Sequence, residues 1–219
     1  MVKSFSVLMS LYAKERPEYL RECIESILRQ TAVPDEIVIV KDGPLTNALE
    51  RVLSEYINQS PALYTIVPLE RNQGLGLALA EGLLHCRNEL VARMDTDDIC
   101  REDRFELQLK KFEEDPSLDI CGSQILEFEH DIDHIVARRN VPISDKAIKK
   151  YQKRRDGFNH VSVMFKKSAV LRAGNYQSCM LMEDTYLWVN MFNANCRAAN
   201  IDDDLVYVRI GEDMFERRG

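Results

Sequence analysis

Two patterns of apolar and polar positions alternate along the first half of the chain. Leu20, Cys23, Ile24 and Ile27 are spaced like one face of an amphipathic helix, which follows Pro17. The run 36–40 is apolar after its first residue and mostly β-branched, which predicts a strand covered on both faces. The same reasoning predicts strands at 4–10, 36–40, 62–68 and 89–94, and further helices at 45–57, 75–85 and 102–113.

This alternation predicts an α/β fold with a doubly wound, mostly parallel sheet flanked by helices. In such a sheet, ligands bind beyond the carboxyl ends of the strands. Polar residues that follow the strands should therefore gather along one edge.

The pattern changes after about residue 116, and a mixed second half is expected. Strands are predicted at 119–129, 160–166 and 197–209, and helices at 144–156 and 181–192. Without a linker or repeat, residues 1–219 form one expected domain, with halves at about 1–115 and 116–219. The segment 216–219 is mostly charged, and no helix or strand is predicted there. We therefore expect that the chain is truncated or that it ends in a tail.

Composition narrows the function classes. The net charge of −7 argues against a generally basic nucleic-acid-binding surface. The six cysteines form no CxxC pair, which predicts reduced, mostly buried thiols and a cytoplasmic protein. No apolar run is long enough to span a membrane, although the protein could lie beside one.

Three carboxylates follow the predicted strand 89–94 within four residues: Asp95, Asp97 and Asp98. Like charges this close repel each other, and each raises the pKa of its neighbours. A hard divalent cation bound together with phosphate oxygens would neutralise them. The alternative is a solvated acidic loop.

Further motifs occur in a fixed order around this cluster. Leu11-Tyr12 follows the first strand, Asp42-Gly43 the second, and Arg71-Asn72-Gln73-Gly74 precedes a helix. Far downstream, Glu183-Asp184 opens a helix that carries Trp188. This order and spacing resemble the family 2 glycosyltransferases, which have the GT-A fold. The resemblance covers nearly the whole chain and is strongest to non-processive bacterial members that build surface polysaccharides.

The resemblance implies a metal-dependent site for a nucleotide-sugar, most often a UDP-sugar. Asp97 would hold Mn²⁺ or Mg²⁺, Asp95 would lie near the metal or the ribose, and Asp98 would help hold the donor. Asp42 would accept a hydrogen bond from the base, although an Asp before Gly is also common in turns. The Leu11-Tyr12 segment would lie along the base, and Arg71 would meet base or phosphate unless it is simply an exposed arginine.

The same resemblance implies an inverting transfer in which Asp184 is the general base. Glu183 is the close alternative for that role. The other interpretation is that both residues simply favour the positive N-terminus of a helix. His160 would touch the acceptor or phosphate, or else have a structural role. Trp188 would stack on a sugar ring, or else belong to the core or the groove wall.

The expected acceptor is a hydroxyl of a saccharide or of a lipid-linked acceptor. The basic stretch 146–155 is expected to be a solvated helix face, or else to contact anionic lipid headgroups at the inner face of the cell membrane.

Three other functions compete with this one. A catalytically silent nucleotide-sugar-binding protein would keep the same motifs. A haloacid-dehalogenase-like phosphatase would have its acidic motif near the chain start. A sugar nucleotidyltransferase would have a glycine-rich loop directly after the first strand, and residues 12–16 contain no glycine.

Overall fold

The computed structural model describes residues 4–179 and 181–211. The expected charged end at 216–219 lies outside the described residues. The strands are β1 (Phe5–Leu11), β2 (Glu36–Lys41), β3 (Tyr64–Pro68), β4 (Leu90–Arg93), β5 (Ile99–Cys100), β6 (Ile120–Glu129), β7 (Ile135–Arg139), β8 (Met164–Lys166) and β9 (Ala198–Ile210). The α-helices are α1 (Pro17–Leu28), α2 (Asn47–Gln59), α3 (Leu75–His85), α4 (Arg104–Glu114), α5 (Asp145–Tyr151), α6 (Lys167–Arg172) and α7 (Glu183–Asn193).

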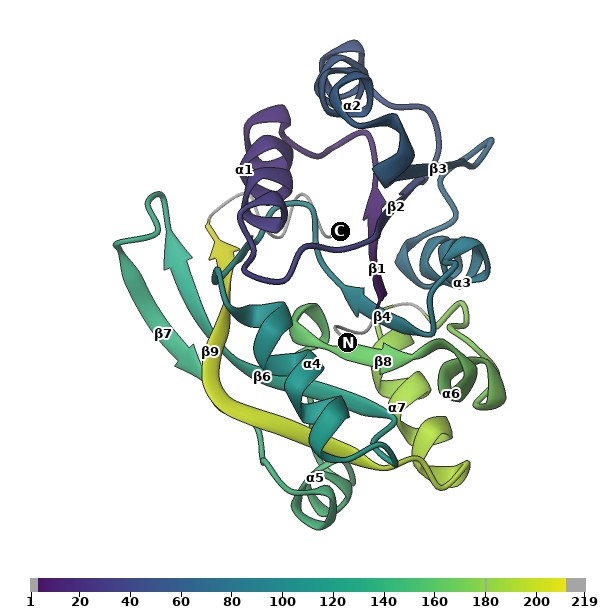
Figure 1. Cartoon of the computed structure of the whole chain (residues 1–219), viewed down its shortest axis with the longest axis vertical. Coiled ribbons are helices and arrows are strands. Elements are labelled where there is room, and N and C mark those ends of the chain that lie inside the picture. Colours follow the sequence, from purple (N-terminus) through teal and green to yellow (C-terminus); the bar gives the residue numbers. More distant parts are fainter. Residues whose placement is uncertain (1–3, 180, 212–219) are drawn as a thin grey trace.

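The strands form a single curled sheet with the order β3-β2-β1-β4-β8-β6-β9-β5, and β7 pairs with the outer part of β6 (Figure 1). The first four of these strands are mutually parallel, as the alternation predicts. Beyond β4 the sheet is mixed, because β8 runs antiparallel to both β4 and β6. The predicted α/β class, with a mixed second half, is confirmed.

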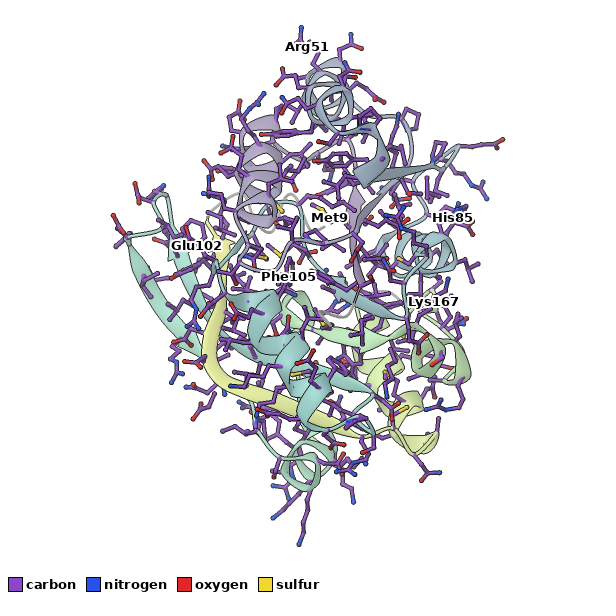
Figure 2. The ribbon with its side chains drawn as sticks, in the orientation of Figure 1. Met9, Arg51, His85, Glu102, Phe105 and Lys167 are labelled. Atoms are coloured by element: carbon purple, nitrogen blue, oxygen red, sulfur yellow. The ribbon has the colours of Figure 1, made fainter. Side chains whose placement is uncertain are left out.

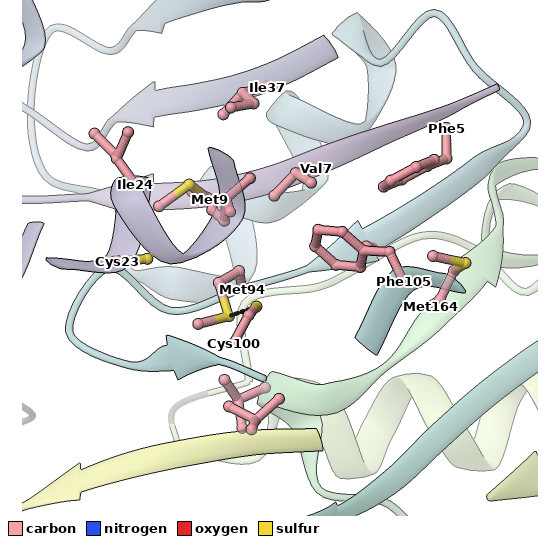
Figure 3. Packing of buried hydrophobic residues seen from close by; sticks show 14 of the residues in the cluster. Phe5, Val7, Met9, Cys23, Ile24, Ile37, Met94, Cys100, Phe105 and Met164 are labelled. Atoms are coloured by element: carbon pink, nitrogen blue, oxygen red, sulfur yellow. Dashed lines mark hydrogen bonds between the residues drawn. The ribbon is translucent and has the colours of Figure 1, made fainter. Parts of the chain in front are cut away.

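Helices cover both faces of the sheet, and each face has its own apolar cluster. On one face α1, α2 and α4 pack with residues such as Val7 and Met9 of β1. Figure 3 shows Ile24 of α1 and Phe105 of α4 beside these strand residues. On the other face lie α3, α5, α6 and α7. Central strands are therefore apolar on both sides, which explains the continuous run in β2.

Two local predictions differ from the structure. The predicted helix 144–156 ends at Tyr151, where the Gln152 side chain accepts the Gly157 N–H at 2.7 Å and donates to Asp156 at 2.9 Å. These local bonds compete with further helical turns. The predicted strand 160–166 begins with a 3-10 turn over His160–Ser162, so that β8 is only Met164–Lys166.

Some short elements have no recognisable sequence pattern. β7 is exposed at all five positions and therefore lacks an apolar alternation. The two-residue β5 and the six-residue α6 are too short to show a period. None of these elements supplies a predicted site residue.

Two expectations from composition can be compared with the structure. The six cysteines all lie within the described residues, carry free thiols, and five of them are buried. Among the described helices, none combines the length and apolar composition needed to cross a bilayer.

Candidate active site

Parallel pairing brings the ends of β1, β2 and β4 to one edge of the sheet. Leu11 at the end of β1 is in register with Lys41 at the end of β2, and Leu8 is in register with Arg93 at the end of β4. The segments that follow these strands carry Tyr12, Asp42 and the acidic cluster. The predicted gathering of polar residues at this edge is thus a consequence of the strand register.

The carboxylates of Asp95, Asp97 and Asp98 lie together in the loop between β4 and β5. One oxygen from each falls within 4.8 Å of the others. Asp97 and Asp98 are largely buried, and Asp95 is partly exposed. Three carboxylates of this kind form a hard-oxygen donor set, which fits Mg²⁺ or Mn²⁺.

Contacts from distant segments fix the acidic loop. The Cys23 thiol donates to the Asp95 carbonyl at 3.1 Å, and the Thr96 hydroxyl donates to buried Glu15 at 2.8 Å. From β9, the Arg209 backbone N–H donates to the Asp98 carboxylate at 2.8 Å, and its guanidinium donates to the Asp97 carbonyl at 3.1 Å. The loop is therefore fixed by α1, by the segment before α1, and by β9.

Arg93 is a buried cation at the centre of the site. Its guanidinium donates two hydrogen bonds to the Asp95 carboxylate, one of them at 2.7 Å to Oδ2. Burial alone would lower the pKa of Arg93. The charge and hydrogen bonding of Asp95, together with the charges of Tyr176 and Asp98, more than offset burial, and the pKa lies above the ordinary value. Arg93 also acts on the acids of α7, because its charge lowers the pKa of both Glu183 and Asp184 against the effect of burial.

Glu183 and Asp184 form the first turn of α7, where the helix dipole favours negative charge. Burial nevertheless raises the pKa of each carboxyl group above its ordinary value. The Asp95 charge also raises the pKa of Glu183, so these acids and the acidic loop belong to one electrostatic site. A partly buried carboxylate with a raised pKa is suited to accept a proton.

Gly76 allows the start of α7 to approach α3 closely. A Cβ atom at this position would collide with the Gln177 carbonyl oxygen and lie 3.0 Å from Cβ of Glu183. Any side chain here would push the segment before α7 outward. The glycine in α3 thus sets the position of the two acids.

Asp42 has a structural partner at the same edge. Its two carboxylate oxygens accept the backbone N–H groups of Gln73 at 2.7 Å and Gly74 at 3.0 Å. Asp42 therefore holds the loop that leads into α3. Its predicted contact with a base stays a prediction, since each oxygen has a second lone pair.

The three other residues predicted near the nucleotide differ in exposure. Leu11 is fully buried in the core, so only its backbone can face a ligand. Tyr12 is partly exposed and Arg71 is exposed. Their contacts with the donor stay predictions.

The two residues predicted near the acceptor, His160 and Trp188, pack against each other. Trp188 is fully buried and packs edge-on against Phe158 and His160. Sugar stacking by Trp188 is therefore wrong for this structure, and the core alternative is the one observed. His160 hydrogen-bonds the Tyr176 hydroxyl at 3.0 Å, and burial, followed by the Arg93 charge, lowers its pKa. The predicted contact of His160 with the acceptor or phosphate stays a prediction.

Comparison with known proteins identifies this arrangement. Residues 6–175 match the family described as Glycosyl transferase family 2. The chain belongs to this family. It is a glycosyltransferase, and the phosphatase alternative is wrong.

Relatives of this family member align along nearly the whole chain. An uncharacterized glycosyltransferase of Haemophilus influenzae is 50% identical over 98% of the chain and 79% of its own length. The amylovoran biosynthesis glycosyltransferase AmsE of Erwinia amylovora is 43% identical over 98% and 79%, respectively. The UDP-Gal:alpha-D-GlcNAc-diphosphoundecaprenol beta-1,3-galactosyltransferase of Escherichia coli is 38% identical over 98% and 77%.

Solved structures share the GT-A fold of this glycosyltransferase. Staphylococcus aureus TarS 1–349 in complex with UDP-GlcNAc superposes with a TM-score of 0.73 at 20% identity, over 95% of the chain and 59% of TarS 1–349. The mannosyltransferase PcManGT of Pyrobaculum calidifontis, in complex with GDP-Man and Mn²⁺, gives 0.72 at 17% identity over 98% and 60%. The chain thus spans about three fifths of each solved chain.

Several contributors to the site were not predicted from the sequence. Arg93 is a charged residue within an apolar strand directly before the acidic cluster, and this interruption is a signal that could have identified it. Glu15, Tyr176 and Arg209 carry no comparable local signal. They reach the site only through the tertiary fold.

Proposed function

We propose that this glycosyltransferase is metal-dependent and inverting, and that it transfers a sugar from a UDP-sugar to a hydroxyl of a saccharide or lipid-linked acceptor during surface polysaccharide synthesis. The proposal rests on one observation: the acidic loop after β4 and the two acids at the start of α7 share one buried cation. The buried Arg93 is bound to Asp95 in the loop after β4, and its charge also lowers the pKa of both acids at the start of α7.

The acidic loop would hold the donor diphosphate through a divalent cation. The family motif favours Asp97 as the main protein ligand, with Asp95 beside it. One carboxylate oxygen from each of these residues and from Asp98 lies within 4.8 Å of the others. When bound, Mn²⁺ or Mg²⁺ would stabilise the negative charge that develops on the departing diphosphate. PcManGT, which shares the fold, was solved with Mn²⁺ and a nucleotide-sugar.

Asp184 would act as the general base, with Glu183 as the alternative. The proton of the acceptor hydroxyl passes to the carboxylate while the hydroxyl oxygen bonds to the anomeric carbon. The bond from that carbon to the diphosphate oxygen breaks, and UDP leaves with the electron pair. A single displacement of this kind inverts the anomeric centre.

The choice of donor and acceptor rests on the relatives. The name of the Escherichia coli enzyme specifies a UDP-sugar donor and a diphosphoundecaprenol-linked acceptor, and AmsE is named for amylovoran biosynthesis. A lipid-linked acceptor lies in a membrane, and the transferase must meet both this acceptor and the nucleotide-sugar. The proposal therefore places the protein in the cytoplasm, at the inner face of the cell membrane.

Calorimetric titration with UDP, with and without Mn²⁺, tests the donor site. We expect wild-type protein to bind UDP only with the metal, and Asp97→Ala to lose this binding. Asp203→Ala, at an exposed acid of β9, is the matched control and should bind normally. No binding of UDP, GDP or dTDP by the wild type would contradict the proposal.

Turnover separates an enzyme from a silent binding protein. Release of UDP from a panel of UDP-sugars, with a lipid-diphosphate-linked sugar as acceptor, should depend on Asp184. Tight UDP binding without any turnover across the panel would favour the silent alternative.

A further inference from the structure

The outward face of α7 carries a row of exposed apolar side chains. Tyr186 and Val189, together with Met182 just before the helix, recur at the spacing of one helical face. Their exposed fractions are 47%, 43% and 53%, and neighbouring Leu181 is 76% exposed. The opposite face of α7, with Leu187 and Met191, is fully buried. The helix is therefore apolar on both sides, although only one side packs against the protein.

A basic segment lies along one side of this row. The Thr185 hydroxyl donates to the Asp156 carboxylate at 2.6 Å, which joins the start of α7 to the end of the basic segment. At the other end of α7, the Lys149 ammonium lies 5.6 Å from the centre of the Phe192 ring. Residues 146–155 therefore run beside the helix, and they contain six basic residues and no acidic one.

Most of these basic charges point into solvent without compensation. Within the described residues, Lys149 pairs with Asp145, and the structure gives no ion pair to the other five: Lys146, Lys150, Lys153, Arg154 and Arg155. All five are exposed. A chain with a net charge of −7 thus concentrates positive charge beside an exposed apolar row.

This surface, which we call the α7 surface, consists of Leu181, Met182, Tyr186 and Val189 with the basic residues of 146–155. It borders the active site, because α7 begins with Glu183 and Asp184. A substrate approaching Asp184 from this side would meet both apolar and positively charged side chains.

We infer that the α7 surface docks this glycosyltransferase on an anionic lipid bilayer. The apolar side chains would insert at the boundary between headgroups and acyl chains, and the flanking Lys and Arg side chains would contact anionic headgroups. A protein partner would also cover apolar side chains, but the uncompensated positive charge favours an anionic lipid surface. The orientation would direct the active site toward a lipid-linked acceptor, a point that rests on the proposed function.

Sedimentation with vesicles tests the inference. The probes are phosphatidylcholine vesicles with and without phosphatidylglycerol, each at low and high salt. We expect wild-type protein to bind the anionic vesicles, to bind pure phosphatidylcholine far more weakly, and to be released by salt. Absence of binding to the anionic vesicles would overturn the inference.

Two double variants separate the two components of the surface. Arg154→Glu with Arg155→Glu should weaken binding by roughly tenfold or more, since each basic residue near an anionic surface contributes to affinity. Tyr186→Ser with Val189→Ser should also weaken binding and make the remainder more sensitive to salt.

Arg51→Glu with Lys110→Glu is the matched control, with the same change of net charge. Arg51 lies on α2, at the far end of the molecule from α5 (Figures 1 and 2). Lys110 is an exposed residue of α4, on the other face of the sheet. An equal loss of binding in this control would overturn the inference, because binding would then depend only on net charge.

Self-association and UDP binding complete the test. If the wild type dimerises in analytical ultracentrifugation and Tyr186→Ser with Val189→Ser abolishes the dimer, the face belongs to a second copy and the inference fails. UDP binding is measured on every variant and should be unchanged. Loss of vesicle binding with normal UDP binding therefore separates this inference from the proposed function.

Discussion

Arg93, the last residue of β4, forms a bidentate ion pair with Asp95, two positions further along the chain. The Arg93 side chain is only 2% exposed, whereas that of Asp95 is 27% exposed. The pair thus has one end in the core and the other at the acidic loop. Arg93 orients Asp95, and its charge also lowers the pKa of the two acids of α7.

Arg93→Met should destabilise the protein, because Asp95 would lose the cation that compensates it. We expect a loss of about 2 to 3 kcal/mol in the free energy of unfolding, below the cost of breaking a fully buried pair. Metal-dependent UDP binding should weaken as well. Urea unfolding and calorimetry measure the two effects.

Arg101→Met is the matched control for this prediction. Arg101 and Asp103 have the same spacing and two parallel hydrogen bonds, but both side chains are about a third exposed. Loss of such a pair should cost about 1 kcal/mol or less. Equal effects of the two variants would contradict the special role of Arg93.

Asp184→Asn should abolish most turnover while leaving UDP binding intact. Removal of a general base lowers rates by about 10²- to 10⁴-fold. Steady-state kinetics give kcat, and calorimetry gives the affinity for UDP. Glu183→Gln should have the smaller effect on kcat, and the reverse order would assign the base to Glu183.

The same variant makes an opposite prediction for stability. Burial raises the pKa of Asp184 in the folded protein above its unfolded value. Folding therefore disfavours the ionised form, and stability is lost as the pH rises through the folded pKa. Asp184→Asn should raise the Tm at neutral pH by about 1 to 3 °C, and the difference should vanish as the pH falls below the unfolded pKa. Thermal unfolding of both proteins over this pH range tests the prediction. A lower Tm for Asp184→Asn than for the wild type at pH 7 would contradict it.

Gly76→Ala should impair catalysis through the position of α7. The new methyl group meets a backbone oxygen, which cannot rotate away, so the segment at Gln177 must shift together with Glu183. We expect a loss of about 1 to 3 kcal/mol in stability and a lower kcat even well below the Tm.

Gly82→Ala is the control on the same helix. Its methyl group would lie 2.5 Å from side-chain atoms of Leu8 and Val40, within the core and away from the acids. This variant should lose stability without a selective loss of kcat. A selective loss of kcat in Gly82→Ala would show that the effect of Gly76 is not specific.

Sequence patterns alone predict the α/β class, the parallel first half and the edge at which the acids gather. Period and alternation are local properties, and β1, β2 and β4 carry them strongly because both faces are buried. Parallel strands end at a common edge, so the position of Asp42 near the acidic cluster followed from strand direction alone. The motifs and their order also identified the family.

The residues that complete the site are brought there by tertiary contacts. Arg209 meets Asp98 across 111 positions, and Glu15 meets Thr96 across 81. The burial of Trp188 and the raised pKa values of Glu183 and Asp184 depend on what packs around α7. Hydrogen bonds, desolvation and close packing arise between segments distant in sequence, and no local pattern in either segment encodes them.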